Sequence, residues 1–148
     1  LDFNARFSAK QRYYVYKIIN RPSVNIINAG LQYWVREPLD VELMREAASY
    51  LIGKHDFSSF RAAQCQSSSP VKTISNIEIT REGDNIEIYV SAISFLHHMV
   101  RNIVGNLLQV GKGIWPPEKM KEILEQRNRS RGAPTAPAEG LYFLKVDY

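Results

Sequence analysis

The chain has 148 residues, 45% of them hydrophobic and 23% charged, which is typical of one soluble globular domain and excludes a disordered or fibrous chain. No apolar run approaches the roughly 18 residues that a membrane-spanning helix needs. A single cysteine, Cys65, cannot form an internal disulfide, and this usage favours a reducing, cytoplasmic compartment. The sequence opens on Leu1 rather than Met, so we expect a segment of a longer protein, organised as one domain over residues 1–148.

The net charge of +4 is modest, but the cations are unevenly distributed. After Asp2 the next acidic residue is Glu37, and lysines and arginines alternate with aromatic residues between them. Cations displace counterions from phosphates and aromatic rings stack on unpaired bases, so this mixture favours an RNA-binding surface. A set of solvated faces on a basic protein explains the charges equally well.

The first predicted element is a strand over residues 12–20, whose aromatic and β-branched residues are typical of a strand buried on both faces. A shorter strand is expected over residues 31–36. A helix is predicted from its N-cap Asp40 to about Ile52, because apolar residues recur at helical spacing and Gly53 is a natural stop.

Residues 57–71 have no periodicity and are rich in Ser and Gln. They form either a flexible surface loop or, because Phe60 and Arg61 are adjacent, a basic binding loop. A hairpin follows, with alternating strands over residues 77–80 and 86–91 and a turn between them.

The next helix is predicted over residues 96–110, since apolar residues cover one half of its surface and mostly polar residues the other half. Arg101 falls at the seam between the halves. Pro117 begins another short helix, and a last strand is expected over residues 141–146. The simplest interpretation is one α+β domain, a mostly antiparallel sheet with helices packed on one face.

Several kinds of catalytic centre are disfavoured by the sequence. His97 and His98 are adjacent in a helix and point about 100° apart, so they cannot easily share a metal ion. No nucleophile motif is present, and no glycine-rich loop opens a helix as a phosphate site requires. Arg101 remains, because a half-buried guanidinium needs a carboxylate or phosphate partner. A salt bridge within its own domain is the ordinary alternative.

Five stretches carry a resemblance to a known family. They are residues 4–9 with the tyrosines at 14 and 16, residues 55–61 (HDFSSFR), residues 65–67 (CQS), residues 95–111 (FLHHMVRNIVGNLLQVG) and residues 138–143 (AEGLYF). In this order they resemble the C-terminal half of the bacterial tRNA pseudouridine synthase A family. The resemblance implies a ferredoxin-like-derived fold and an isomerase that converts uridine to pseudouridine in the tRNA anticodon stem-loop, without metal or cofactor.

In that family the essential aspartate stands on a Gly-Arg-Thr-Asp-Ala-Gly motif in the N-terminal half. This sequence holds no such motif. We therefore expect the chain to be inactive by itself. The partners implied by the resemblance are tRNA, the N-terminal half of the same protein and a second copy in a homodimer, with no membrane.

The resemblance also implies residue roles. Tyr14 would stack on the target base and assist proton removal at C5, Arg101 would pair with the missing aspartate and keep it ionised, and Leu141 would form an apolar wall of the pocket. The residues that would contact RNA are Arg12, Phe60, Arg61 and His97. Tyr13 departs from the pattern, since many members carry a second basic residue there.

Two other interpretations stay open. The basic, aromatic first third is also typical of a stand-alone RNA-binding module with a ferredoxin-like sheet. The apolar helices would equally serve a dimerisation domain without catalysis, because an apolar face can cover an interface as well as a core.

Overall fold

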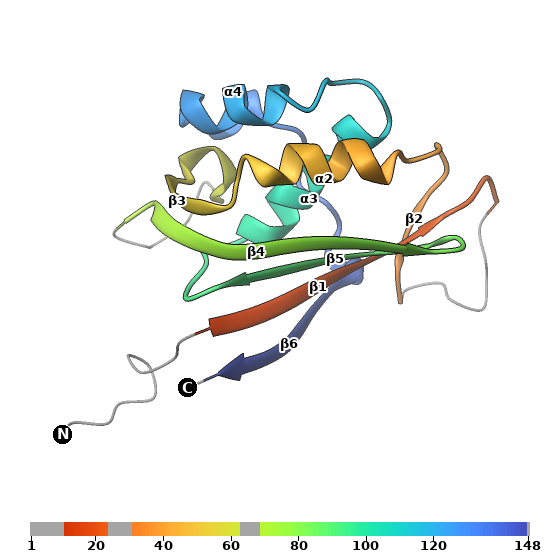
Figure 1. Cartoon of the computed structure of the whole chain (residues 1–148), viewed down its shortest axis with the longest axis horizontal. Coiled ribbons are helices and arrows are strands. Elements are labelled where there is room, and N and C mark those ends of the chain that lie inside the picture. Colours follow the sequence, from red (N-terminus) through yellow and green to blue (C-terminus); the bar gives the residue numbers. More distant parts are fainter. Residues whose placement is uncertain (1–10, 24–30, 63–68, 148) are drawn as a thin grey trace.

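The structure, a computed structural model, describes residues 11–23, 31–62 and 69–147. The expectations for residues 4–9 and for Cys65 lie outside these ranges. Within them, a six-stranded sheet forms one layer, and helices lie on one of its faces (Figure 1). The strands are β1 (Gln11–Asn20), β2 (Tyr33–Val35), β3 (Gly53–Asp56), β4 (Val71–Glu82), β5 (Asn85–Ala92) and β6 (Leu141–Asp147).

The helical elements are α2 (Val41–Ser49), α3 (Met99–Gly111) and α4 (Lys119–Gln126), with short 3-10 turns η2 (Ser58–Phe60), η3 (Arg129–Arg131) and η4 (Ala138–Gly140). Helices α2 and α3 lie over the sheet and α4 lies beyond them (Figure 1). The strand order is β2-β1-β5-β4-β3, with β6 also paired to β1. Only the β1–β2 pairing is parallel among the described strands. The predicted α+β class and mostly antiparallel sheet are confirmed.

Strand β1 is buried on both faces, as predicted. Tyr16 and Ile18 point into the core between sheet and helices and are fully buried. Val15 and Ile19 alternate with them and are also buried, on the opposite face. Strand β1 pairs with β5 along one edge and with β6 and β2 along the other, so it contacts three of the other strands of the sheet.

The interpretation of residues 57–71 as a surface loop is wrong at both ends. Phe57 and Phe60 are fully buried, with their rings 6.1 Å apart, and Val71 already opens β4. Strand β3 was not predicted. Its residues follow α2 directly and pair with β4 as an edge strand, from Gly53 opposite Ile74 to Asp56 opposite Val71.

Helix α3 begins at Met99, three residues later than predicted. His98, at its N-cap, has a left-handed backbone with φ of 62°, which a helix cannot include. The polar side of α3 is not a solvent face, because Asn102 and Asn106 are almost fully buried. They lie under the segment that follows α4, so the helix is covered on both sides.

None of the helices in the described part of the chain combines the length and the apolarity needed to cross a membrane.

Candidate functional site

A small cavity lies where the first turn of α3 meets β1 and the start of β6. Its volume is about 150 Å³. The residues around it are Tyr14, Phe95, Leu96, His98, Met99, Val100, Arg101, Ala138 and Leu141. The fold thus brings together at one place the three residues for which the resemblance implied pocket roles: Tyr14, Arg101 and Leu141.

Tyr14, on β1, is held by two aromatic neighbours, one after β5 and one on β6. Its ring makes edge-to-face contacts with Phe95 at 5.1 Å and Phe143 at 5.3 Å between centroids. Such pairs stabilise one ring orientation beyond the effect of burial alone. The Tyr14 side chain is half-buried, and its hydroxyl makes no hydrogen bond to any of the residues that the structure describes. The two ring contacts therefore fix the orientation of the Tyr14 ring.

Arg101 is half-buried and held from one side. Its Nε donates to the carbonyl of Ala136 at 2.8 Å, and the Ala136 N–H donates back to the Arg101 carbonyl at 3.1 Å. No carboxylate within residues 11–23, 31–62 and 69–147 lies within 4.0 Å of its guanidinium. The alternative of a salt bridge inside the domain is therefore not realised in that part of the chain.

The charge of Arg101 affects the pKa of a neighbouring core residue, Tyr16. Burial raises the pKa of the Tyr16 hydroxyl well above its usual range, while the positive charge of Arg101 acts in the opposite direction. The Tyr16 hydroxyl donates to the Pro137 carbonyl at 2.6 Å. Consecutive carbonyls at 136 and 137 thus bind one side chain from α3 and one from β1.

Leu141 is half-buried as the first residue of β6 and pairs with Tyr16 in the sheet register. The residue before it must be small. A Cβ on Gly140 would lie 2.7 Å from the Tyr16 ring and 2.8 Å from the Lys17 carbonyl oxygen. Gly140 therefore lets β6 approach β1 closely enough to place Leu141 at the cavity.

His97 and His98 are adjacent, just before α3. Both are exposed, with ring centroids 4.0 Å apart. Partial burial, with the nearby His97 and Arg101, lowers the pKa of His98. His98 lines the cavity although sequence reasoning did not select it. The signal available was its position three residues before Arg101 in the sequence, although its left-handed backbone places it at the N-cap and not inside α3.

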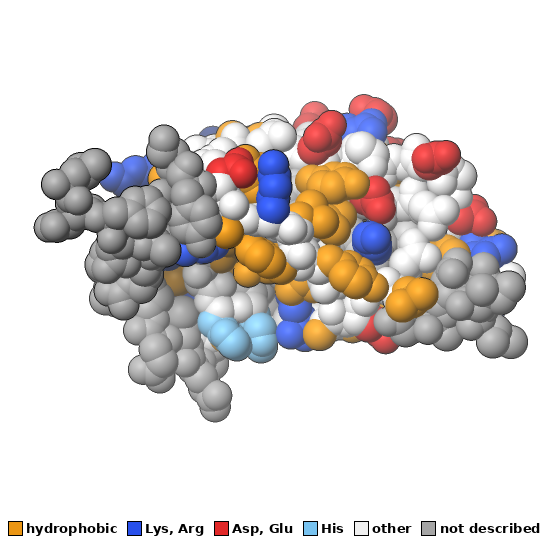
Figure 2. Space-filling view, turned by 90° about the horizontal axis from the view of Figure 1, so that it is seen from below, with side chains coloured by type: hydrophobic (Ala, Val, Ile, Leu, Met, Phe, Trp, Pro, Cys, Tyr) orange, Lys and Arg blue, Asp and Glu red, His pale blue; other side chains and the backbone are white. Residues whose placement is uncertain are grey.

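Of the residues expected to contact RNA, several gather near this end of the sheet. The Arg12 guanidinium donates from Nη1 to the carbonyl of Ile93, just after β5. The Ala62 N–H donates to the His97 carbonyl at 3.1 Å, which ties the segment carrying Arg61 to the start of α3. Seen from the open side of the sheet, histidine side chains lie at one rim, with Lys or Arg beside them (Figure 2).

Phe60 does not belong to this surface. Its ring is fully buried in the core, so it has no face to offer to a base, and the expectation of an RNA contact through it is corrected. Burial prevailed because the aromatic pair Phe57 and Phe60 closes the core beside α3. Tyr13, the position that departs from the family, donates from its hydroxyl to Asp147 at 2.8 Å, and this hydrogen bond raises the pKa of Tyr13.

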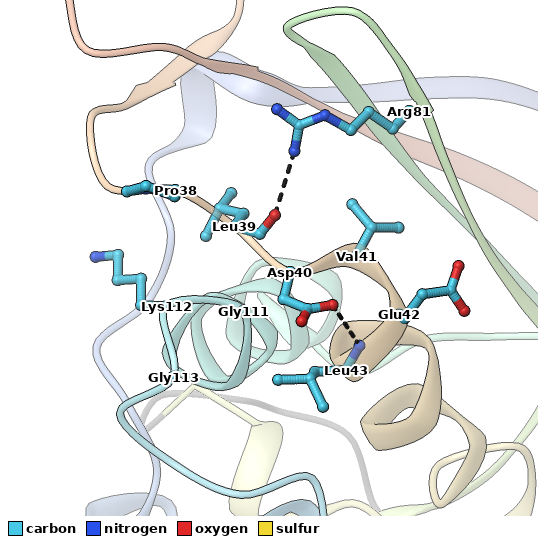
Figure 3. Close-up of a pocket in the computed structure, with 10 residues that line it drawn as sticks. All are labelled: Pro38, Leu39, Asp40, Val41, Glu42, Leu43, Arg81, Gly111, Lys112 and Gly113. Atoms are coloured by element: carbon cyan, nitrogen blue, oxygen red, sulfur yellow. Dashed lines mark hydrogen bonds between the residues drawn. The ribbon is translucent and has the colours of Figure 1, made fainter.

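A larger, wide hollow of about 590 Å³ lies elsewhere, between the start of α2 and the end of α3 (Figure 3). Its polar groups have local partners. Asp40 accepts from the Leu43 N–H at 3.1 Å as the N-cap of α2, Arg81 donates to the Leu39 carbonyl at 3.2 Å, and Lys112 lies 3.8 Å from Glu37. It contains none of the predicted site residues, so the smaller cavity is the candidate site.

Comparison with known proteins agrees with the family resemblance found in the sequence. A family model described as tRNA pseudouridine synthase matches residues 47–148. Two relatives named tRNA pseudouridine synthase A, from Ehrlichia ruminantium strains Gardel and Welgevonden, are 57% and 56% identical over 147 residues. Each match covers 99% of this chain and 60% of the relative, so the chain spans about three fifths of the length of these proteins. The resemblance is confirmed, and the chain belongs to the tRNA pseudouridine synthase family.

Proposed function

We propose that this chain is the C-terminal, tRNA-binding part of a cytoplasmic tRNA pseudouridine synthase that isomerises uridine in the anticodon stem-loop. The observation that carries the proposal is the cavity at which Tyr14, Arg101 and Leu141 meet. One wall is aromatic, one is aliphatic and one presents a guanidinium. That is the chemistry needed to hold a flipped base beside an ionised carboxylate.

In the proposed reaction the N1–C1′ bond breaks, the base turns, and a C5–C1′ bond forms. A proton leaves C5 and N1 gains one, so the reaction is an isomerisation that requires no outside oxidant or reductant. Tyr14 stacks on the base, and its hydroxyl is placed to assist the proton transfer at C5. Leu141 closes the apolar side and keeps water from the sugar–base bond.

The site is completed by a group from outside the described residues, and Arg101 is the residue that binds this group. Its Nη1 and Nη2 make no hydrogen bond to any residue described here, whereas Nε is already bound by Ala136. A half-buried guanidinium in this state favours a carboxylate, and it lowers the pKa of that carboxylate so that it stays ionised. We propose that the catalytic aspartate of the N-terminal half occupies this place, and that the chain is inactive without it.

The proposal includes two partners. Arg12, Arg61 and His97 supply the contacts to the RNA backbone around the cavity. A second copy forms a homodimer, for which exposed apolar side chains such as Phe143 and Leu144 on β6 offer contact area.

The test is pseudouridine formation on unmodified tRNA. The chain is assayed by itself and mixed with the part of the Ehrlichia ruminantium (strain Gardel) relative that it does not cover. We expect activity only in the mixture, and a loss of roughly a thousandfold with Arg101→Ala, because the aspartate then loses its half-buried partner. Lys121→Ala, on the exposed surface of α4, is the matched control and keeps the activity.

Activity of the chain by itself would overturn the proposal, since one of its own carboxylates would then be catalytic. An inactive mixture, with association of the two parts shown by sedimentation, would favour the stand-alone RNA-binding module instead. The basic and aromatic residues around the cavity favour that second function independently of catalysis.

A further inference from the structure

The segment between α4 and β6 lies directly on α3. A Cβ on Gly105 would stand 2.1 Å from the Pro134 carbonyl oxygen, so only glycine allows this approach. Ala133 and Ala136 are buried against the helix. The segment has little regular structure of its own, and its position depends on what attaches it to α3.

Asn102 is the centre of that attachment. Its side chain is 1% exposed, and all of its polar atoms are used. Oδ1 accepts from the Thr135 hydroxyl at 2.5 Å and from Arg129 Nη2 at 2.9 Å, and Nδ2 donates to the Phe60 carbonyl at 2.8 Å. Arg129 Nη2 also donates to the Thr135 hydroxyl oxygen at 3.0 Å, which closes a triangle among three side chains.

Two adjacent residues of α3 bind two adjacent residues of the segment. Asn102 binds Thr135 through side chains, and Arg101 binds Ala136 through the reciprocal pair of hydrogen bonds at 2.8 and 3.1 Å. The Ala136 carbonyl, which restrains the Arg101 guanidinium, therefore directly follows Thr135, the residue that Asn102 binds. A shift at Thr135 displaces the planar peptide unit that carries the Ala136 N–H, and the Ala136 carbonyl follows across a single Cα.

We propose that Asn102 and Thr135 are positioning residues for Arg101. They fix the Ala136 carbonyl, which aims the guanidinium into the cavity beside Tyr14 and Leu141. Neither side chain lines that cavity, so both act through Arg101 rather than on the substrate. The catalytic consequence rests on the proposed function. The positioning of Arg101 does not.

The buried hydrogen bonds of Asn102 and Thr135 restrict the conformations that the Arg101 side chain can adopt. Arginine has many rotamers, and one hydrogen bond to a movable carbonyl would leave its guanidinium spread over several positions. Binding that carbonyl through a satisfied buried network selects one position before the substrate arrives. Small misplacements of a charged catalytic partner are costly in rate.

The test compares two deletions of a hydroxyl in the same segment. Thr135→Val removes the hydrogen bonds to Asn102 and Arg129 at nearly constant volume. Ser130→Ala removes an exposed hydroxyl whose partner is Asn128. The first measurement is the rate of hydrogen exchange of the Arg101 Nε–H, which ¹⁵N NMR of the full chain reports. We expect exchange roughly tenfold faster in Thr135→Val, and no change in Ser130→Ala.

The second measurement is kcat and KM in the mixture with the complementing part of the Ehrlichia ruminantium relative. We expect kcat to fall by roughly ten- to a hundredfold in Thr135→Val with little change in KM, and Thr135→Ser to restore most of it. Unchanged Nε–H exchange in a folded Thr135→Val protein would overturn the inference, and so would an equal defect in Thr135→Ser. If the mixture makes no pseudouridine at all, the proposed function fails, while the exchange measurement still decides the positioning role.

Discussion

At the level of single residues, Arg101 and Gly105 lie about one turn apart on nearly the same face of α3, where the cavity adjoins the tightly packed segment that follows α4. Arg101 lines the cavity together with Tyr14, whereas Gly105, about one helical turn later, has no side chain because Pro134 occupies that space. A glycine inside a helix reduces its stability, so the close contact is the physical reason for it.

Gly105→Ala is expected to destabilise the protein by about 2 kcal/mol, because the new methyl group collides with a backbone carbonyl that cannot rotate away. Chemical denaturation measures the loss. The matched control is Gly111→Ala at the end of the same helix, where the nearest atom is the Sδ of Met44 at 2.7 Å and a flexible side chain can move. Equal stability of the two variants would contradict the packing described for Pro134.

At the level of elements, η2 and β3 show how serines can build structure rather than a loop. Asp56 accepts from the Ser58 N–H at 2.9 Å and from its hydroxyl at 2.6 Å. The buried Ser59 hydroxyl donates to the Ile123 carbonyl at 2.6 Å and accepts from the Asn128 N–H at 2.9 Å. Local hydroxyl bonds of this kind stabilise tight turns, and they attach this turn to α4.

Asp56 gives this turn a dependence on pH. Burial acts to raise the pKa of Asp56, but the hydrogen bonds from Ser58 and the charges of Arg127 and Arg61 outweigh it, and the pKa is lowered. A lowered carboxyl pKa adds stability above the unfolded value of about 3.9, and this stability is lost as the pH falls through the folded pKa.

We therefore expect Asp56→Asn to lower the free energy of unfolding by about 1 kcal/mol at pH 7, and the difference from the parent chain to vanish at acid pH. Denaturation curves from pH 7 down to below the folded pKa test this. Glu46→Gln, an exposed carboxylate on α2, is the control and should change stability little at any pH. If the difference in the free energy of unfolding persisted unchanged at acid pH, the ionised state of Asp56 would not be the source of its contribution to stability.

At the level of the whole molecule, the helices cover one face of the sheet, and none of the helices in the described part of the chain lies on the other, open face (Figures 1 and 2). Hydrophobic side chains lie across that open face with cations among them (Figure 2). Lys17 lies 4.9 Å from the Tyr142 ring centre and Lys145 lies 4.8 Å from that of Tyr13. Lysines placed over rings keep their charge at the surface, which suits contact with an anionic partner.

Binding of tRNA should depend steeply on salt if the cations around the cavity contact phosphates. We expect Arg12→Ala to reduce the slope of log Kd against log salt concentration by about 0.7–0.9, the release of one counterion. Lys121→Ala, on α4, should leave the slope unchanged. Filter binding or fluorescence anisotropy at four salt concentrations measures both. An identical slope for the two variants would place the RNA elsewhere on the surface.

Periodicity allowed the longest elements to be predicted, because helices and strands with one buried face repeat their apolar residues regularly. The β4–β5 hairpin and helix α3 are predicted in this way, whereas strand β1 is predicted from its aromatic and β-branched composition. Strand β3 has four residues and no alternation, so no local signal distinguishes it from the end of α2. The buried η2 turn was read as a loop because its composition is polar and its burial depends on α3 and α4.

By itself, the sequence determined the fold class and the family, and the resemblance predicted three residues of the pocket. Only the tertiary structure decided that Tyr14, Arg101 and Leu141 share one cavity, that His98 joins them and that Phe60 does not face solvent. It also decided which carbonyl holds Arg101, since Ala136 lies 35 residues away in a segment without periodicity. Hydrogen bonds of that range leave no pattern in the sequence, because their partners meet only after the sheet and helices have packed.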